Sequence, residues 1–404
     1  MIGISKLYCG AVEAGDVLRY HGRKAGDLPS HLLQFSADKR PVVVWNVTKQ
    51  CNLRCLHCYA QATAGAAPNE LGPEEGLALL RDLKDFGVPV VLFSGGEPLM
   101  RPDLWQLIEQ TVAAGLRAVL STNGTLISRE VARRLKDLGL SYVGISLDGT
   151  EATHDRFRGQ PGALAAAMAG VRHCQEQGLK VGLRFTVSRL NYREVPAIFD
   201  LVEAYDLPRI CFYHLVYAGR GSDLVEEALE HDQTRALVDL ICARTRRLFE
   251  SGRPLEVLTV DNHADGPYIY LKLLQEDPQR AAEVLELLKM NEGNNSGRGI
   301  GCVSWDGEVY ADQFWRHYSF GNVRRRPFSQ IWTDLSNPLM ARLKDKKRFM
   351  TGRCRQCRWL EVCGGNFRVR AEALTGDLWA PDPACYLTDE EIGVSRGTAG
   401  RAPA

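Results

Sequence analysis

Cysteine is the residue type whose spacing in this chain most clearly indicates chemistry. Seven of the twelve cysteines fall in two tight groups within 404 residues. Since the amino terminus has no basic segment followed by an apolar run, we expect no export signal and a reducing compartment. In such a compartment, grouped cysteines indicate metal ligation rather than disulfide bonds.

The first group places Cys51, Cys55 and Cys58 in the spacing C-x3-C-x2-C. A 4Fe-4S cluster has four irons, so three cysteine ligands leave one iron free to chelate a small molecule. The alternative is a zinc ion completed by His57 or by a distant residue, because zinc takes four nitrogen or sulfur ligands. The number of cysteines favours the cluster, and the zinc site stays open as the alternative.

The second group places Cys354, Cys357 and Cys363 in the spacing C-x2-C-x5-C, and Cys385 follows further along the chain. Four thiolates complete either a zinc tetrahedron or a fully ligated 4Fe-4S cluster. Spacing alone favours zinc slightly. The remaining isolated cysteines are typical of small core residues, and we assign no role to Cys9, Cys174, Cys211 and Cys242.

Strands and helices that alternate between residues 41 and 215 must position these groups. Continuous apolar strands that alternate with amphipathic helices predict a parallel sheet covered by helices. Six such units fit either an open doubly wound sheet or an incomplete barrel, and the pattern does not separate the two. The predicted strands are residues 41–46, 89–94, 117–121, 142–147, 180–186 and 209–215.

Polar loops follow four of these strands at their carboxyl ends, where parallel α/β folds gather their chemistry. The first cysteine group follows the first strand, and residues 122–124 follow the third. The Gly95-Gly96-Glu97 loop after the second strand offers carbonyls and a carboxylate to an ammonium group. Ser146 and Asp148, at the end of the fourth strand, are candidate partners for a ribose or simply form a capped turn.

Changes of pattern divide the chain into five predicted parts. An amino-terminal segment (1–40) precedes the strand-helix core (41–220), and a helical connecting region (221–300) precedes the cysteine-rich region (301–390). The last residues (391–404) have the small, polar composition of a disordered tail. A net charge of +1 gives no strong field, and no eighteen apolar residues run together. We therefore expect a cytoplasmic protein without nucleic-acid or membrane partners.

Three motifs together resemble the radical S-adenosylmethionine (SAM) superfamily. They are the cysteine loop that closes on Tyr59, the Gly-Gly-Glu-Pro loop, and the Ser-Leu-Asp-Gly strand end. The resemblance implies a partial (β/α)6 barrel in which the first three cysteines hold a 4Fe-4S cluster. It also implies that SAM chelates the open iron through its methionine amino and carboxylate groups. The Gly95 to Glu97 loop would then receive the amino group, and Ser146 would lie near the ribose.

The cysteine-rich region resembles the SPASM domain, which carries auxiliary clusters in many radical SAM enzymes. That resemblance implies a second 4Fe-4S cluster on Cys354, Cys357, Cys363 and Cys385. The chain departs from the pattern at Phe367, where another cysteine is usual, and only Cys302 remains upstream. A second auxiliary cluster therefore looks lost, and Cys302 is either a remnant or faces the substrate. Four ligands leave no open iron, which favours electron relay or scaffolding.

A closer resemblance over residues 1 to 390 is to the didecarboxysiroheme deacetylases of the alternative haem-biosynthesis route. It rests on long strings such as MIGISKLYCG, EVLTVDNHADGPY and GIGCVSWDGEVYADQFW. The resemblance implies removal of two acetate side chains from iron-bound 12,18-didecarboxysiroheme, which gives iron-coproporphyrin III. It further implies a low-potential electron donor of the ferredoxin or flavodoxin type.

Such a substrate is a flat iron macrocycle with several carboxylates, and the chain offers matching side chains. Each is as readily structural as functional. The candidate carboxylate partners are Arg184, Arg220, Arg316, Arg368 and Arg370. The candidate stacking surfaces are Tyr213, Trp305, Phe314 and Trp315, and the histidines able to approach iron are His214 and His317.

Three other readings compete with the deacetylase. A related radical enzyme that removes propionates for the haem of nitrite reductase, or one that decarboxylates iron-coproporphyrin, would share the chemistry. A peptide-modifying maturase is suggested by the SPASM-like region, but the missing cysteines and the absence of a small peptide-recognition domain before the first strand disfavour it. A non-enzymatic zinc or electron-transfer module would form no deoxyadenosine.

Overall fold

The structure is a computed structural model that describes residues 1–12, 40–253 and 255–394. The predicted amino-terminal segment therefore lies mostly outside the described residues. The predicted tail overlaps the last short helix, α17 (Asp389–Ile392), and its residues 395–404 also lie outside.

The six predicted strands are confirmed, with ends that shift by one or two residues. They pair in parallel and in chain order, because each apolar run is followed by a helix that returns the chain to the same end of the sheet. These strands are β2 (Val42–Thr48), β3 (Val90–Gly95), β4 (Arg117–Thr122), β5 (Tyr142–Ser146), β6 (Val181–Val187) and β7 (Arg209–His214).

Further strands extend the sheet at both edges, and the sequence did not predict most of them. β8 (Glu256–Val260) pairs in parallel with β7, and β1 (Ile2–Gly3) closes that edge in antiparallel fashion. At the other edge β9 (Ile300–Val303) pairs in parallel with β2 and forms an antiparallel hairpin with β10 (Val309–Tyr310). The predicted helical region 221–300 thus also supplies a strand to the sheet.

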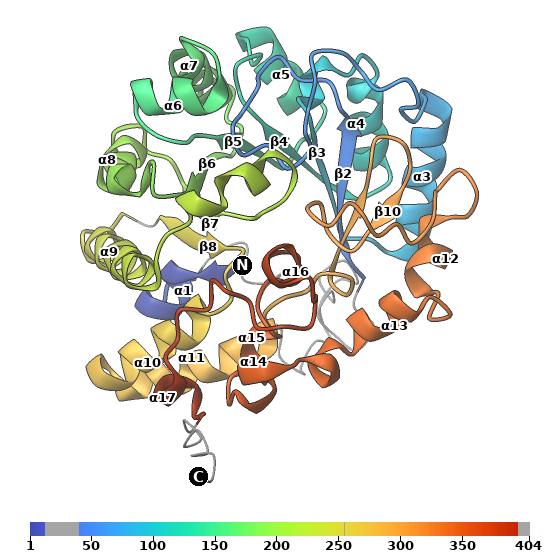
Figure 1. Cartoon of the computed structure of the whole chain (residues 1–404). Coiled ribbons are helices and arrows are strands. Elements are labelled where there is room, and N and C mark those ends of the chain that lie inside the picture. The colour runs from blue at the N-terminus through green and yellow to red at the C-terminus, as the bar shows by residue number, and fades with distance from the viewer. Residues whose placement is uncertain (13–39, 254, 395–404) are drawn as a thin grey trace.

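Helices cover the outer face of the curved sheet, which leaves its inner face around a central space (Figure 1). This arrangement is the incomplete barrel rather than the open doubly wound sheet. The covering helices are α3 (Pro73–Phe86), α4 (Leu104–Ala113), α5 (Arg129–Asp137), α6 (Glu151–Arg158), α7 (Ala163–Glu176), α8 (Val195–Ala204) and α9 (His231–Glu250). Their apolar positions are buried, as Leu104, Leu107 and Ile108 of α4 illustrate.

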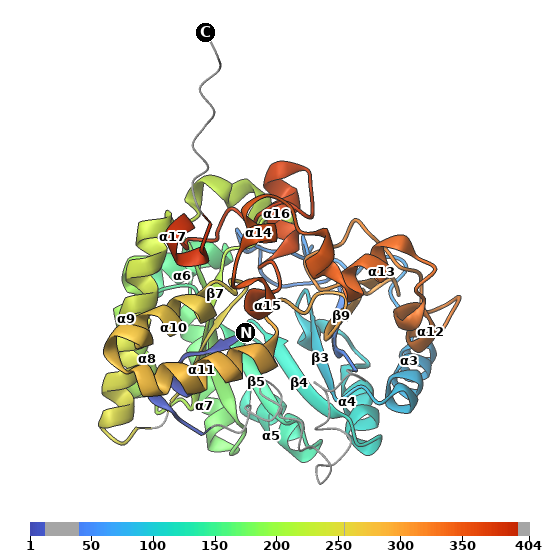
Figure 2. The same ribbon diagram turned by 90° about the horizontal axis from the view of Figure 1, so that it is seen from below.

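The later helices lie across the open side of the barrel (Figure 2). They are α10 (Asp265–Glu276), α11 (Pro278–Asn291), α12 (Phe328–Thr333), α13 (Pro338–Lys344), α14 (Gly352–Gln356), α15 (Leu360–Cys363) and α16 (Arg368–Thr375). At the amino terminus, α1 (Ile4–Cys9) packs against α9 and β8. α10 and α11 pack against α15, which brings the second cysteine group beside the connecting region. None of the helices in the described ranges is long and apolar enough to cross a bilayer.

Candidate active site

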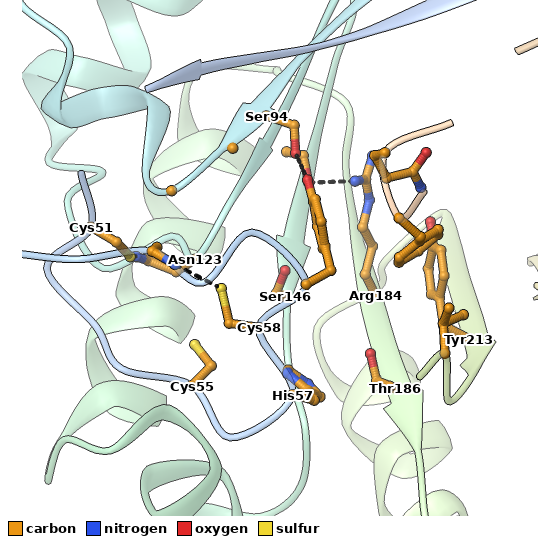
Figure 3. A pocket seen from close by; sticks show the side chains of 18 of the residues that line it. Cys51, Cys55, His57, Cys58, Ser94, Asn123, Ser146, Arg184, Thr186 and Tyr213 are labelled. Atoms are coloured by element: carbon orange, nitrogen blue, oxygen red, sulfur yellow. Dashed lines mark hydrogen bonds between the residues drawn. The ribbon is translucent and has the colours of Figure 1, made fainter. Parts of the chain in front are cut away.

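The first cysteine group forms a loop at the carboxyl end of β2. Backbone hydrogen bonds fold the loop onto its surroundings: Cys51 N donates to Thr63 O at 2.8 Å, and Leu56 N donates to Phe157 O at 2.9 Å. Cys51, Cys55 and Cys58 line one cavity of about 200 Å³. Figure 3 shows them on one side of this space, with the side chains from β6 and β7 across from them.

Hydrogen-bond donors lie close to the three sulfurs. Arg158 Nη1 lies 3.5 Å from Cys55 Sγ, and Asn123 Nδ2 lies 4.0 Å from Cys51 Sγ. The backbone amide of Ala62 points at Cys58 Sγ from 3.5 Å. A guanidinium and several N–H groups around sulfur atoms favour thiolates or an anionic cluster.

Burial opposes ionisation of these thiols while they are uncoordinated. It raises the pKa of Cys51 to about 12, and it also raises the pKa of Cys55 although Arg158 acts in the opposite direction. Coordination by metal requires the thiolate form, so loading of this site releases protons.

Asp148 anchors the cysteine loop to the end of β5. Its buried carboxylate lies 2.6 Å from Arg158 Nη2 and 3.0 Å from His57 Nε2. Burial would raise the pKa of this carboxyl, but Arg158 and His57 outweigh burial and hold it well below its usual range. His57, which also lines the cavity, is therefore a hydrogen-bond partner of Asp148.

The residues of the Gly95-Gly96-Glu97 loop have different environments. Gly95 and Gly96 line the cavity, and a Cβ on Gly96 would lie 2.1 Å from Gln50 O, so only glycine allows the loop to approach the cysteine segment this closely. The Glu97 carboxylate is fully buried and faces away from the cavity.

Glu97 binds the neighbouring β4 loop instead. It accepts hydrogen bonds from Thr122 Oγ1 at 2.7 Å, Asn123 N at 2.8 Å and Leu99 N at 3.2 Å. Burial raises its pKa despite these donors. Ser146, by contrast, lines the cavity at the end of β5, where the sequence placed it.

The second cysteine group also surrounds one space. Cys354, Cys357, Cys363 and Cys385 line a small cavity of about 20 Å³ beneath α10 and α15. Burial raises the pKa of Cys357 to about 11 and of Cys363 and Cys385 to about 12. Among the described residues, no three His, Cys, Asp or Glu side chains converge as the ligands of a single metal ion.

Cys302 and Phe367 stand apart from this group. Cys302 is fully buried against Val44 and Tyr310, and its Sγ lies 3.5 Å from Asn46 Nδ2. Cys302 does not line the cavity beside the first cysteine group, nor the second large cavity described below. Phe367 is buried and packs edge to face on Phe314 at 5.6 Å.

A second large cavity, of about 300 Å³, continues the first one through the barrel. The residues that line both cavities include Val44, Leu92, Arg184, Tyr213, Asp261, Gln313 and Phe314. Together the two cavities reach the size of pockets that hold drug-sized ligands. The barrel interior thus joins the first cysteine group to the amino ends of the strands.

Four of the predicted substrate contacts line these cavities: Arg184, Tyr213, His214 and Phe314. His214 lines the first cavity and pairs with Asp265 Oδ2 at 2.9 Å. The other candidates have structural partners or lie elsewhere, and they are Arg220, Arg316, Arg368, Arg370, Trp305, Trp315 and His317.

Arg368 and Arg370 illustrate the structural alternative that the sequence left open. Arg368 donates to the carbonyls of Leu378 and Ala380, and Arg370 forms a fully buried ion pair with Asp382. A guanidinium donates to backbone carbonyls as readily as to a ligand, and the sequence alone does not distinguish these two roles. The sequence likewise gave no signal for Arg158 as a partner of Cys55.

Two family models match the chain: the radical SAM superfamily over residues 45–202 and the SPASM iron-sulfur cluster-binding domain over residues 296–358. Fe-coproporphyrin III synthase of Methanosarcina barkeri is 66% identical over 97% of this chain and 99% of its own. Pre-heme d1 synthase of Dinoroseobacter shibae is 43% identical over 88% of each chain.

Similarity of fold is found at lower identity. The crystal structure of Streptococcus suis SuiB bound to S-adenosylmethionine matches with a TM-score of 0.68 at 17% identity, over 88% of this chain and 80% of that one. The matched domains take a 4Fe-4S cluster with SAM and an auxiliary iron-sulfur cluster as their cofactors. The chain belongs to the radical SAM enzymes with a SPASM domain, in the family that includes Fe-coproporphyrin III synthase and pre-heme d1 synthase.

Proposed function

We propose that this enzyme removes two acetate side chains from 12,18-didecarboxysiroheme and gives iron-coproporphyrin III in siroheme-dependent haem synthesis. The observation that carries the proposal is the 66% identity to Fe-coproporphyrin III synthase along nearly the full length of both chains. The joined cavities in the barrel supply an interior space that reaches the first cysteine group.

In this proposal Cys51, Cys55 and Cys58 ligate the catalytic 4Fe-4S cluster and leave one iron for SAM. These cysteines line one side of a common cavity and their sulfurs receive N–H donors, which suits an anionic cluster. When bound and reduced, the cluster and SAM supply a 5′-deoxyadenosyl radical that abstracts a hydrogen atom from the substrate.

The surrounding residues position the cofactors. The backbone of Gly95 and Gly96 would receive the methionine amino group, and Ser146 would lie near the ribose. Glu97 would contribute indirectly, because its carboxylate orders the turn that carries Asn123. Arg158, held by Asp148, keeps a positive charge beside Cys55.

Cys354, Cys357, Cys363 and Cys385 would ligate the auxiliary 4Fe-4S cluster. Four protein ligands leave no open iron, so this cluster relays electrons or supports the fold rather than chelating substrate. The electron donor in this proposal is a small low-potential protein of the ferredoxin or flavodoxin type.

A second candidate is removal of propionate side chains, because pre-heme d1 synthase is 43% identical to this chain. It differs from the first candidate in the side chain that is lost and not in the radical chemistry.

The test is anaerobic incubation of the iron-reconstituted protein with reductant, SAM and didecarboxysiroheme, with mass spectrometry of the tetrapyrrole and the nucleoside. Loss of two acetates together with 5′-deoxyadenosine supports the proposal. Formation of 5′-deoxyadenosine with no change in the tetrapyrrole would overturn the proposed substrate but not the assignment as a radical SAM enzyme. In the same assay, Cys55→Ala removes a proposed cluster ligand and should form no 5′-deoxyadenosine. Cys174→Ala is the matched control, because Cys174 lies on α7 and outside both cysteine groups.

A further inference from the structure

The inner face of the barrel is layered from one end of the strands to the other. On β4 the residues that face the cavities alternate: Arg117 at the amino end, then Val119, then Ser121 at the carboxyl end. The carboxyl ends contribute small hydroxyl side chains beside the first cysteine group. The amino ends contribute basic and aromatic side chains at the opposite end of the interior, among them Arg117, Tyr142 and Arg209.

Arg117 is the residue at this far end that the fold does not explain. Its side chain is half-buried and lines the larger cavity, yet no hydrogen bond or ion pair joins it to any residue in the described part of the chain. Burial and the nearby Arg209 lower its pKa more than the charge of Glu256 raises it. Protein interiors rarely leave a charged group without a counterpart.

Neighbouring groups add to the positive character of this end. Arg209 stacks over the Tyr142 ring at 4.7 Å and pairs with Glu256, which neutralises one guanidinium. The Tyr142 hydroxyl is buried without a hydrogen-bond partner among the described residues.

Arg184 lies one step closer to the cysteine end of the interior. A Cβ on Gly144 would lie 2.3 Å from Arg184 Nε, so glycine makes room for this side chain on the inner face. Arg184 donates to Ser121 Oγ at 2.5 Å, a neutral partner. Arg117, Arg184 and Arg209 thus line one cavity. The carboxyl groups that line the same cavity are Asp261 and Asp312, and burial raises the pKa of both.

We propose that Arg117, Tyr142, Arg184 and Arg209 form a carboxylate-binding pocket, called here the rear pocket, for side chains of the tetrapyrrole that the reaction leaves intact. The inference rests on the proposed function and adds an orientation to it. The macrocycle lies in the apolar middle of the barrel, between Val44, Leu92 and Phe314. Its retained carboxylates point to the rear pocket, and the acetate to be lost points to the first cysteine group.

The experiment uses the reconstituted holoenzyme and follows binding of iron-coproporphyrin III by its optical spectrum. Arg117→Gln removes the charge, Arg117→Lys retains it, and Arg129→Gln is the matched control, since Arg129 is 74% exposed and pairs with Glu176 on the surface. Loss of one charge-assisted contact predicts a rise in Kd of about 10- to 100-fold for Arg117→Gln. Arg117→Lys recovers part of that loss, and Arg129→Gln matches the unchanged enzyme.

A second measurement needs no substitution. The tetramethyl ester of iron-coproporphyrin III lacks the carboxylates, so the unchanged enzyme should bind it at least as weakly as Arg117→Gln binds the acid, and Arg117→Gln should weaken binding of the acid more than binding of the ester. An unchanged Kd for Arg117→Gln, or an equal loss of acid and ester binding, overturns the rear pocket. Substrate-independent SAM cleavage checks that the variant is folded.

The two proposals fail separately. If the unchanged enzyme does not convert didecarboxysiroheme but binds the acid through Arg117, the rear pocket stands and the deacetylase falls. If it converts the substrate with a KM that Arg117→Gln does not alter, the deacetylase stands and the rear pocket falls.

Discussion

Asp382→Asn tests whether a buried ion pair holds the second cysteine group in place. Asp382 accepts two hydrogen bonds from Arg370, at 2.9 and 2.8 Å, and both side chains are 0% exposed. The same carboxylate accepts from Phe367 N and Ala384 N, each at 2.9 Å, and Asp382 O accepts from Cys385 N at 3.0 Å. One residue thus joins the Cys385 segment to the start of α16.

The magnitude follows from the burial of the pair. Asparagine keeps the shape of the side chain but leaves the Arg370 guanidinium buried without a counter-charge, which costs about 3–5 kcal/mol. Unfolding entropy of about 2.1 cal/mol/K per residue, taken over 404 residues, converts this cost into a fall in Tm of roughly 4–6 °C.

The assay combines thermal unfolding with iron analysis of the reconstituted protein. We expect Asp382→Asn to lose auxiliary-cluster iron while it still forms 5′-deoxyadenosine. Asp345→Asn is the matched control, because Asp345 pairs with Arg348 at 3.0 Å on the surface, where the side chains are 55% and 80% exposed. Such a pair contributes at most about 1 kcal/mol. Equal Tm values for the two variants would refute the reasoning.

Three other predictions concern the cofactor site and the cavity. Cys51→Ala should abolish 5′-deoxyadenosine formation, whereas Cys354→Ala should retain part of it and lose tetrapyrrole turnover; the reverse pattern would exchange the roles of the two groups. Gly96→Ala should weaken SAM binding at least about tenfold by displacing the loop from Gln50 O, measured by equilibrium binding, and unchanged affinity would contradict the close approach. Burial raises the pKa of Asp261 from near 3.8 to about 7, with the amino terminus and Arg370 opposing it. The folded protein therefore holds a proton that the unfolded chain has lost, and stability decreases by up to about 4 kcal/mol as pH rises from 4 to 7. The Tm difference between Asp261→Asn and the unchanged protein should grow up to pH 7 and then stay constant, and a difference that is flat from pH 5.5 to 8.5 would contradict this.

Sequence predicted the strands that local pattern specifies and missed those that distant pairing specifies. The six central strands are continuous apolar runs between amphipathic helices, so period and composition identify them. β8 is a short run within a charged helical region, and its identity as a strand depends on β7, which precedes it by more than forty residues. The parallel pairing of β9 with β2 likewise joins segments far apart in the chain and was not predicted.

For the candidate site, too, the sequence predicted the features that depend on neighbouring residues and missed those that depend on distant contacts. The cysteines and glycines follow from spacing, because adjacent ligands and close loops are local. The hydrogen bonds from Thr122 and Asn123 to the buried Glu97 carboxylate join neighbouring loops, and the sequence did not predict them. Arg117 could have been found from the alternation along β4, which places it on the same face as Ser121.

Phe367, which stands where the SPASM pattern usually has a cysteine, contributes to the wall of the larger cavity. Phe367 lines the larger cavity and packs on Phe314 at 5.6 Å, and Phe314 packs on Tyr59 at 5.2 Å. Tyr59 follows Cys58 directly, so a row of aromatic rings connects the first cysteine loop to the start of α16. A thiolate at position 367 would need a metal or a counter-charge, whereas a phenyl ring adds apolar surface that suits a flat macrocycle. Phe367 therefore extends the apolar lining of the larger cavity, which the proposed orientation of the macrocycle requires.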